Sequence, residues 1–104
     1  MSGMNVTINI QQAFSLRDAV GRCLGELGAK YENMVVLTAD VDVSSRIQVF
    51  KERYPDRCYN VGIAEQSLMS TAAGLAHEGF KPLCFAFAPF ASMRCYEQVR
   101  TDIC

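Results

Sequence analysis

The sequence has no tryptophan, a single histidine and only three prolines among its 104 residues. It also has no excess of basic charge: it contains ten lysines and arginines and eleven acidic residues, and the formal net charge is −1. A protein that binds nucleic acid or an anionic membrane usually needs a basic excess to neutralise phosphates. The charge balance therefore argues against nucleic acid and against a membrane as the main partner.

Long apolar runs are absent as well. None approaches the roughly 18–20 residues of a membrane span, and residues 1–5 lack the basic and apolar regions of a signal peptide. We therefore expect a cytoplasmic protein. Half of the residues are hydrophobic and a fifth are charged, a composition typical of one small globular domain.

The cysteines are odd in number, and no two have the spacing of a zinc-binding knuckle. We expect all of them to be reduced and structural, and we expect this chain to bind no metal ion. They are Cys23, Cys58, Cys84, Cys95 and Cys104.

Hydrophobic periodicity divides the chain into an N-terminal arm (1–14) and one domain (15–104). Ser15 is expected to cap a first helix, whose apolar residues recur at helical spacing and predict one buried stripe. The members of that stripe are Leu16, Val20, Cys23, Leu24, Leu27 and Tyr31.

Short apolar segments at 34–39, 57–61 and 81–87 predict three strands. Between them we expect a helix that begins at Ser44 or Ser45 and another that begins near Glu65; a last helix should begin at Ala91 or Ser92. This alternation is typical of an α/β fold with three layers, α/β/α, and a mainly parallel sheet. No glycine, proline or polar tail ends the last helix, so we expect the domain to be incomplete at its C-terminus.

Glu65 is the one acid at the start of a helix that carries no further charge until Glu78. Such a helix is expected to be buried on most sides. A negative charge in the first turn favours the helix dipole by a few tenths of a kcal/mol, about 0.3–1. That explanation and a functional one are equally open from these residues alone.

Ligands of parallel α/β sheets gather at the carboxyl ends of the strands. In this chain those ends carry Asp40, residues 62–65 and residues 87–90. The sequence therefore predicts a site at this edge of the sheet.

These segments together resemble the pyrimidine-binding domain of the transketolase family of thiamine diphosphate enzymes. The resemblance runs from about Ser15 to Cys104. It rests on the order and spacing of several motifs: Thr38-Ala39-Asp40-Val41, Asn60-Val61-Gly62-Ile63-Ala64-Glu65-Gln66, Gly79-Phe80-Lys81-Pro82, and Phe87 through Phe90 to Arg94, Tyr96 and Glu97.

The resemblance implies roles for five residues. Glu65 would bond a ring nitrogen of the cofactor's aminopyrimidine and so activate the cofactor, while Phe87 and Phe90 would surround the ring. Asp40 would lie near the cofactor and Ile63 below the ring. Core packing also explains Phe87, Phe90 and Ile63, and a strand-to-loop cap explains Asp40; both readings stay open.

Two departures from the family pattern matter. Many relatives have a histidine where this chain has Ser67. The Gly-Asp-Gly…Asn signature, with which the family binds the diphosphate through magnesium, is absent. The resemblance thus implies that a partner subunit or domain holds the diphosphate and the magnesium ion, in a homo- or hetero-oligomer. Arg94 is expected to be an ion-pair partner, and His77 to be a surface or helix-dipole residue.

The implied reaction of the complete assembly is the transfer of a two-carbon ketol unit between sugar phosphates, and the chain alone should be inactive. A deoxyxylulose-phosphate synthase-like domain and the beta subunit of a 2-oxo-acid dehydrogenase are alternatives within the same cofactor class. A non-catalytic assembly or binding fragment is the alternative of another class. A flavodoxin-like domain with an acidic pocket at Asp40 and Asp42 leaves the residues around Glu65 unexplained.

Overall fold

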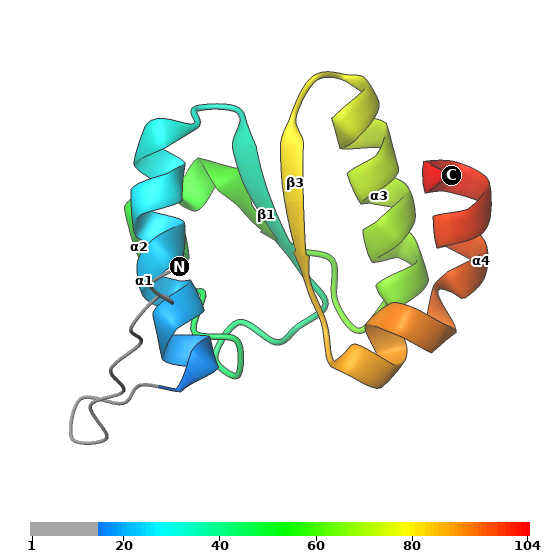
Figure 1. Cartoon of the computed structure of the whole chain (residues 1–104), viewed down its shortest axis with the longest axis horizontal. Coiled ribbons are helices and arrows are strands. Elements are labelled where there is room, and N and C mark those ends of the chain that lie inside the picture. Colours follow the sequence, from blue (N-terminus) through cyan, green and yellow to red (C-terminus); the bar gives the residue numbers. More distant parts are fainter. Residues whose placement is uncertain (1–14) are drawn as a thin grey trace, which may run out of the picture.

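A parallel sheet of three strands, in the order β2-β1-β3, forms the middle layer of the domain (Figure 1). The structure is a computed structural model that describes residues 15–104, so the arm predicted for residues 1–14 lies outside the described residues. The elements, in chain order, are α1 (Leu16–Lys30), β1 (Met34–Thr38), α2 (Gln48–Arg53), η2 (Pro55–Arg57), β2 (Cys58–Asn60), α3 (Glu65–His77), β3 (Lys81–Phe85), η3 (Phe90–Arg94), α4 (Tyr96–Gln98) and η4 (Val99–Ile103).

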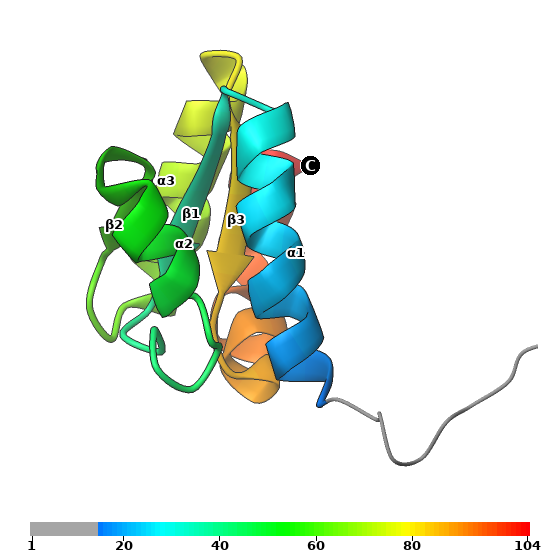
Figure 2. The same cartoon turned by 90° about the vertical axis from the view of Figure 1, so that its left-hand side faces the viewer.

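Helices cover both faces of this sheet. Figures 1 and 2 show α1 and α2 on one side, with α3 and α4 on the other. Every residue of β1 is buried, as expected of a central strand between two helical layers. The predicted three-layer α/β/α class with a parallel sheet is therefore confirmed.

Each face of the sheet has its own apolar core. The core under α1 and α2 is formed by Leu24, Met34, Val36, Ile47, Phe50 and Cys58. The core under α3 is smaller and is formed by Leu37, Ala39, Leu68 and Ala72. Successive residues of β1 point to opposite faces, so this strand contributes to both.

Ser15 caps α1 as predicted, because its Oγ accepts a hydrogen bond from the Asp18 backbone N–H at 3.1 Å. The prediction that Ser44 or Ser45 begins the next helix is wrong. The helix α2 begins at Gln48 without a side-chain cap. Arg46 has a φ of 60°, a left-handed conformation that interrupts a helical start at either serine.

Burial also differs from expectation on two helices. The buried face of α1 consists of Leu24 and three glycines, whereas Leu16, Cys23 and Leu27 of the predicted stripe are exposed. The expectation that α3 is buried on most sides is wrong, because only Glu65, Leu68, Ala72 and Ala73 are buried. No helix within residues 15–104 is long and apolar enough to cross a membrane.

Candidate functional site

Segments that leave the carboxyl ends of the three strands lie next to one another. The Val61 N–H donates to the Thr38 carbonyl at 2.9 Å, and the Ala39 N–H donates to the Phe85 carbonyl at 3.1 Å. These bonds continue the parallel pairing past the last strand residues. The residues that follow β1, β2 and β3 are therefore brought to one edge of the sheet, where a ligand site was predicted.

Glu65 is the first residue of α3 and lies at this edge. A tight turn leads into it: Gly62 has a φ of 82°, and its carbonyl accepts a hydrogen bond from the Ala64 N–H at 2.8 Å. A positive φ of this size favours glycine. Glu65 is only 4% exposed, and it is the only charged residue that is buried between residues 15 and 104.

Arg94 compensates the buried charge. Its Nη1 lies 3.2 Å from Oε2 of Glu65, and the arginine side chain is 47% exposed whereas the glutamate is 4% exposed. A second contact joins the two segments, because the side-chain Nε2 of Gln66 donates to the Arg94 backbone carbonyl at 3.3 Å. A buried carboxylate needs such a charged donor, since leaving it unsatisfied costs roughly 1–3 kcal/mol. Arg94 is thus an ion-pair partner, as predicted.

Phe87 and Phe90 contact each other beside this ion pair. Their ring centroids are 6.4 Å apart at an interplanar angle of 68°, an edge-to-face arrangement. The Arg94 guanidinium carbon lies 4.0 Å from the centroid of Phe90. Phe87 is exposed, so core packing does not account for it. Acid, guanidinium and two rings therefore form one continuous cluster, which we call the Glu65 cluster.

Asp40 lies two residues beyond the end of β1 and has a φ of 61°. Its Oδ1 accepts a hydrogen bond from Asn60 Nδ2 at 3.0 Å, and Asn60 Oδ1 accepts one from the Gly62 N–H at 2.8 Å. The side chain of Asp40 is therefore held against the turn that leads into α3. A strand-to-loop role for Asp40 and a position near a ligand are both compatible with this geometry.

Ile63 projects from the same turn and is 77% exposed. Core packing, one of the two readings open from the sequence, is excluded for this residue. An aliphatic side chain this exposed, two residues before a buried acid, is free to contact a ligand at the sheet edge.

Sequence reasoning missed Asn60, which was read only as part of the motif before Gly62. An Asn-X-Gly spacing favours a local bond from the asparagine oxygen to the backbone two residues on, and this signal was available. Sequence reasoning also left open which acid pairs with Arg94. No local pattern could identify Glu65, because the two residues are 29 positions apart.

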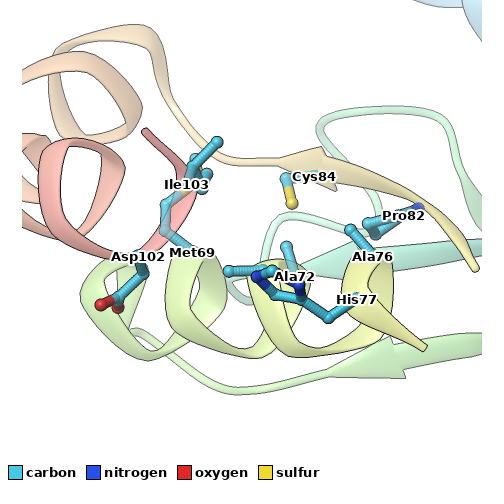
Figure 3. Close-up of a pocket in the computed structure, with 9 residues that line it drawn as sticks. Met69, Ala72, Ala76, His77, Pro82, Cys84, Asp102 and Ile103 are labelled. Atoms are coloured by element: carbon cyan, nitrogen blue, oxygen red, sulfur yellow. The ribbon is translucent and has the colours of Figure 1, made fainter. Parts of the chain in front are cut away.

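A separate cavity of about 490 Å³ lies away from this edge, between α3, β3 and η4 (Figure 3). Its wall is mostly apolar and includes Met69, Ala72, Ala76, Pro82 and Ile103. His77 and Asp102 line it too, but Figure 3 shows them projecting from different parts of the wall. Cys84 also lines this cavity. The Glu65 cluster remains the candidate site, because it lies at the carboxyl edge of the sheet.

No group of histidine, cysteine, aspartate and glutamate side chains that could hold a metal ion occurs in the part of the chain that the structure describes. The donor set of the Glu65 cluster is one carboxylate balanced by one guanidinium. Such a set suits an uncharged, hydrogen-bonding aromatic ring better than it suits a cation.

An α/β domain with a buried acid at the carboxyl edge of a parallel sheet belongs to the class that binds ligands at that edge. The chain belongs to the family described as the transketolase, pyrimidine binding domain, whose sequence model matches residues 12–104. The resemblance inferred from the motifs is therefore confirmed.

Known relatives agree with this membership. A protein of Methanocaldococcus jannaschii described as a transketolase C-terminal section is 44% identical over 85 residues, which are 82% of this chain and 27% of that protein. The 1-deoxy-D-xylulose-5-phosphate synthase of Thermomicrobium roseum is 41% identical over 88 residues, 85% of this chain and 14% of the synthase.

A solved structure described as a split gene transketolase, inactive beta4 tetramer, superimposes with a TM-score of 0.76 at 44% identity. The match covers 85% of this chain and 29% of that chain. The chain thus spans less than a third of the length of these relatives.

Proposed function

We propose that this chain is the pyrimidine-binding part of a transketolase-like enzyme that transfers a two-carbon ketol unit between sugar phosphates. The observation that carries the proposal is the buried carboxylate of Glu65 at the start of α3, beside Phe87 and Phe90. A buried acid is costly to keep and is therefore a candidate for chemistry. Family membership supports thiamine diphosphate as the cofactor that such an acid would serve.

The residues of the Glu65 cluster fit an aminopyrimidine ring. One carboxylate can exchange a proton with a ring nitrogen, and the two phenylalanine rings offer edges and faces to a flat heteroaromatic group. Arg94 already binds Oε2 of the carboxylate, so it keeps Glu65 oriented. Asp40 and Ile63 stand on the adjacent turns and complete the ring's surroundings.

Glu65 holds or donates a proton at the ring nitrogen, which requires a group with an exchangeable proton. Burial excludes water that would compete for this bond, and a low local dielectric strengthens it. Phe87 and Phe90 orient the ring and shield it from solvent. When bound, thiamine diphosphate supplies the carbon nucleophile that attacks the ketose carbonyl.

The rest of the site belongs to a partner in this proposal. The chain lacks the diphosphate-binding signature, so a second subunit or domain holds the diphosphate and its magnesium ion. The M. jannaschii relative is named as a C-terminal section and the solved relative as a beta4 tetramer of a split gene transketolase, and both names support a divided enzyme. The chain on its own is then inactive and works within a cytoplasmic oligomer.

A 1-deoxy-D-xylulose-5-phosphate synthase-like activity is the second candidate. Sequence identity supports it almost as well, because the T. roseum synthase is 41% identical over 88 residues and the transketolase section is 44% identical over 85. The Glu65 cluster serves both reactions equally, since each uses the same cofactor ring. Substrate contacts outside these 104 residues separate the two.

The test combines the chain with a diphosphate-binding subunit, co-expressed from the same source genome. Turnover is measured with a ketose phosphate donor and an aldose phosphate acceptor, and formation of 1-deoxy-D-xylulose 5-phosphate is measured in parallel. We expect ketol transfer by the assembly, and Glu65→Ala should lower it by at least 100-fold. The variant Glu78→Ala, an exposed acid at the other end of α3, is the matched control.

Near-normal turnover of Glu65→Ala would remove this residue from the mechanism. An assembly that forms a stable complex but turns over neither substrate pair would support the non-catalytic assembly role instead. Calorimetry adds a separate check. The chain alone should bind thiamine diphosphate and magnesium negligibly, and micromolar binding would contradict the divided site.

A further inference from the structure

The side chain of Asn60 joins the two loops that frame the Glu65 cluster. Its Oδ1 accepts from the Gly62 N–H at 2.8 Å, and its Nδ2 donates to Oδ1 of Asp40 at 3.0 Å and to Oδ1 of Asp42 at 3.4 Å. A carboxamide offers an acceptor and donors in one rigid plane. Only this orientation of the amide suits a backbone donor on one side and carboxylates on the other.

Both main partners of Asn60 have left-handed backbone. The φ of Asp40 is 61° and that of Gly62 is 82°. A non-glycine residue adopts this conformation at a cost, so Asp40 persists there because its surroundings hold it. The hydrogen bond from Asn60 is the side-chain contact that fixes the direction of its carboxylate.

Consecutive hydrogen bonds fix the conformation of the turn between Asn60 and Glu65. Gly62 bonds both the Asn60 side chain and, through its carbonyl, the Ala64 N–H at 2.8 Å. The Ala64 carbonyl in turn accepts the first helical bond of α3, from Leu68 at 2.9 Å. A displacement of Gly62 is therefore passed on to the first residue of α3, which is Glu65.

Core packing does not require a polar side chain at this position. Asn60 is the last residue of β2 and is exposed, and its pairing with Thr38 in β1 is a backbone feature. The adjacent bond from the Val61 N–H to the Thr38 carbonyl is also independent of the Asn60 side chain. The three side-chain bonds of Asn60 all serve the sheet edge where the Glu65 cluster lies.

We propose that Asn60 is a positioning residue for the reaction: it sets the entry of Glu65 through Gly62 and the direction of the Asp40 carboxylate. This inference rests on the proposed function. Asn60 itself touches no reacting group in it. A displacement of about 1 Å at a catalytic group can lower a rate by up to about 100-fold, so the side chain matters to turnover more than to folding.

The experiment uses the assembly with its diphosphate-binding subunit and compares Asn60→Ala with Asn33→Ala. Asn33 is the matched control because its Nδ2 also donates to the backbone, the Gly79 carbonyl at 3.0 Å, but at the opposite edge of the sheet. We expect Asn60→Ala to lower kcat by about 10- to 100-fold and to weaken thiamine diphosphate binding, with KM for the sugar phosphate and the Tm little changed. Asn33→Ala should change only the Tm.

Asn60→Asp supplies the second variant. An aspartate oxygen can still accept from the Gly62 N–H, whereas it repels Asp40 instead of donating to it. We expect kcat between those of the wild type and Asn60→Ala, together with weaker cofactor binding measured by calorimetry of the assembly. This variant keeps the size of asparagine and the hydrogen bond from the Gly62 N–H. The positioning role can therefore still be tested with it if Asn60→Ala does not fold.

The outcomes separate this inference from the proposed function. Full activity of Glu65→Ala would overturn the function itself. An inactive Glu65→Ala beside an Asn60→Asp or Asn60→Ala variant with wild-type kcat and cofactor affinity would overturn the positioning role alone. The positioning role would also be overturned if the Asn60 and Asn33 variants lost activity in the same proportion to their loss of Tm. Such a result would show that Asn60 has a structural role only.

Discussion

Arg94 Nη1 and Glu65 Oε2, 3.2 Å apart, join the last third of the chain to the start of α3. The guanidinium also lies over the ring of Phe90, so one side chain contacts both the acid and the aromatic part of the site. The glutamate is buried and the arginine is half exposed. The pair therefore neutralises an acid that would otherwise be desolvated alone.

We predict that Arg94→Met lowers the free energy of unfolding by about 1–2 kcal/mol, because a buried carboxylate loses its charged donor. Methionine keeps an apolar stem over Phe90. Glu65→Gln and the double variant complete a double-mutant cycle, measured by urea unfolding with far-ultraviolet circular dichroism. A coupling energy of about 1 kcal/mol is expected, and additive effects of the two substitutions would contradict a direct interaction.

Arg57 supports the opposite, α1-facing side of the sheet. Its Nε donates to the Met34 carbonyl at 2.9 Å, and its Nη2 donates to the carbonyls of Gly28 and Tyr31 at 2.9 and 2.7 Å. The guanidinium carbon lies 4.4 Å from the ring centroid of Tyr54. One planar group thus binds the end of α1 and the start of β1.

We predict that Arg57→Ala lowers the free energy of unfolding by about 2–4 kcal/mol, since three acceptors lose a charged donor and the ring loses a cation. Arg57→Lys should restore little, because a single ammonium group cannot reproduce the planar fork of the guanidinium. Arg100→Ala, at an exposed position of η4, is the control and should change stability by less than about 0.5 kcal/mol. A fully stable Arg57→Lys would show that charge alone suffices.

The sequence predicted the parts of the fold that depend on local patterns. Ser15 begins α1, and the apolar segment of β1 is buried along its whole length. The burial of Glu65 and the convergence of the strand ends were also within reach, because topology rules place them. The partners of Arg94 and Asn60 are set by the tertiary fold. The local hydrophobic periodicity of the sequence does not predict them.

The two errors in predicted helix burial have a common physical origin in small residues. Periodicity predicted a buried stripe on α1 from its larger apolar side chains, but Gly21, Gly25 and Gly28 face the core instead. A glycine lets another segment approach the helix axis closely. A hydrophobicity scale does not predict such a close approach. On α3 the reverse holds: Ser67, Ser70 and other small residues give an uncharged face that is nevertheless exposed.

Two helical glycines provide a matched test of this explanation. A Cβ at Gly28 would lie 2.7 Å from Cε2 of Phe50 and 2.8 Å from Cε2 of Tyr54, whereas a Cβ at Gly74 of α3 would meet nothing within 4 Å. We predict that Gly28→Ala destabilises the domain by about 1–3 kcal/mol through overpacking. Gly74→Ala should stabilise it by about 0.5–1 kcal/mol through helix propensity.

Thermal and urea unfolding of the two glycine variants measure these changes directly. Both substitutions add the same methyl group to the interior of a helix, so the difference between them isolates the close approach of α2 to α1. A stabilising Gly28→Ala would mean that Phe50 and Tyr54 can move aside, and that the glycine is not required for packing.

Cys84 in β3 links burial to stability at alkaline pH. Burial and, to a smaller extent, the neighbouring Cys95 thiol raise the pKa of its thiol to about 11. The unfolded chain has the ordinary thiol pKa of about 8.5. Between these two values the folded state holds a proton that the unfolded state releases, so the stability contributed by the neutral thiol is present below pH 8.5 and is lost as the pH rises toward 11.

We predict that the wild type loses up to about 2 kcal/mol more unfolding free energy between pH 8 and pH 10.5 than Cys84→Ala does. Urea unfolding at both pH values measures the difference, and the alkaline titration of tyrosine and lysine cancels because both proteins share it. Cys23→Ala removes an exposed thiol and should follow the wild type. Parallel pH dependence of the wild type and Cys84→Ala would show that the Cys84 thiolate is solvated in the folded domain, and that β3 is more open to water than its half-buried residues indicate.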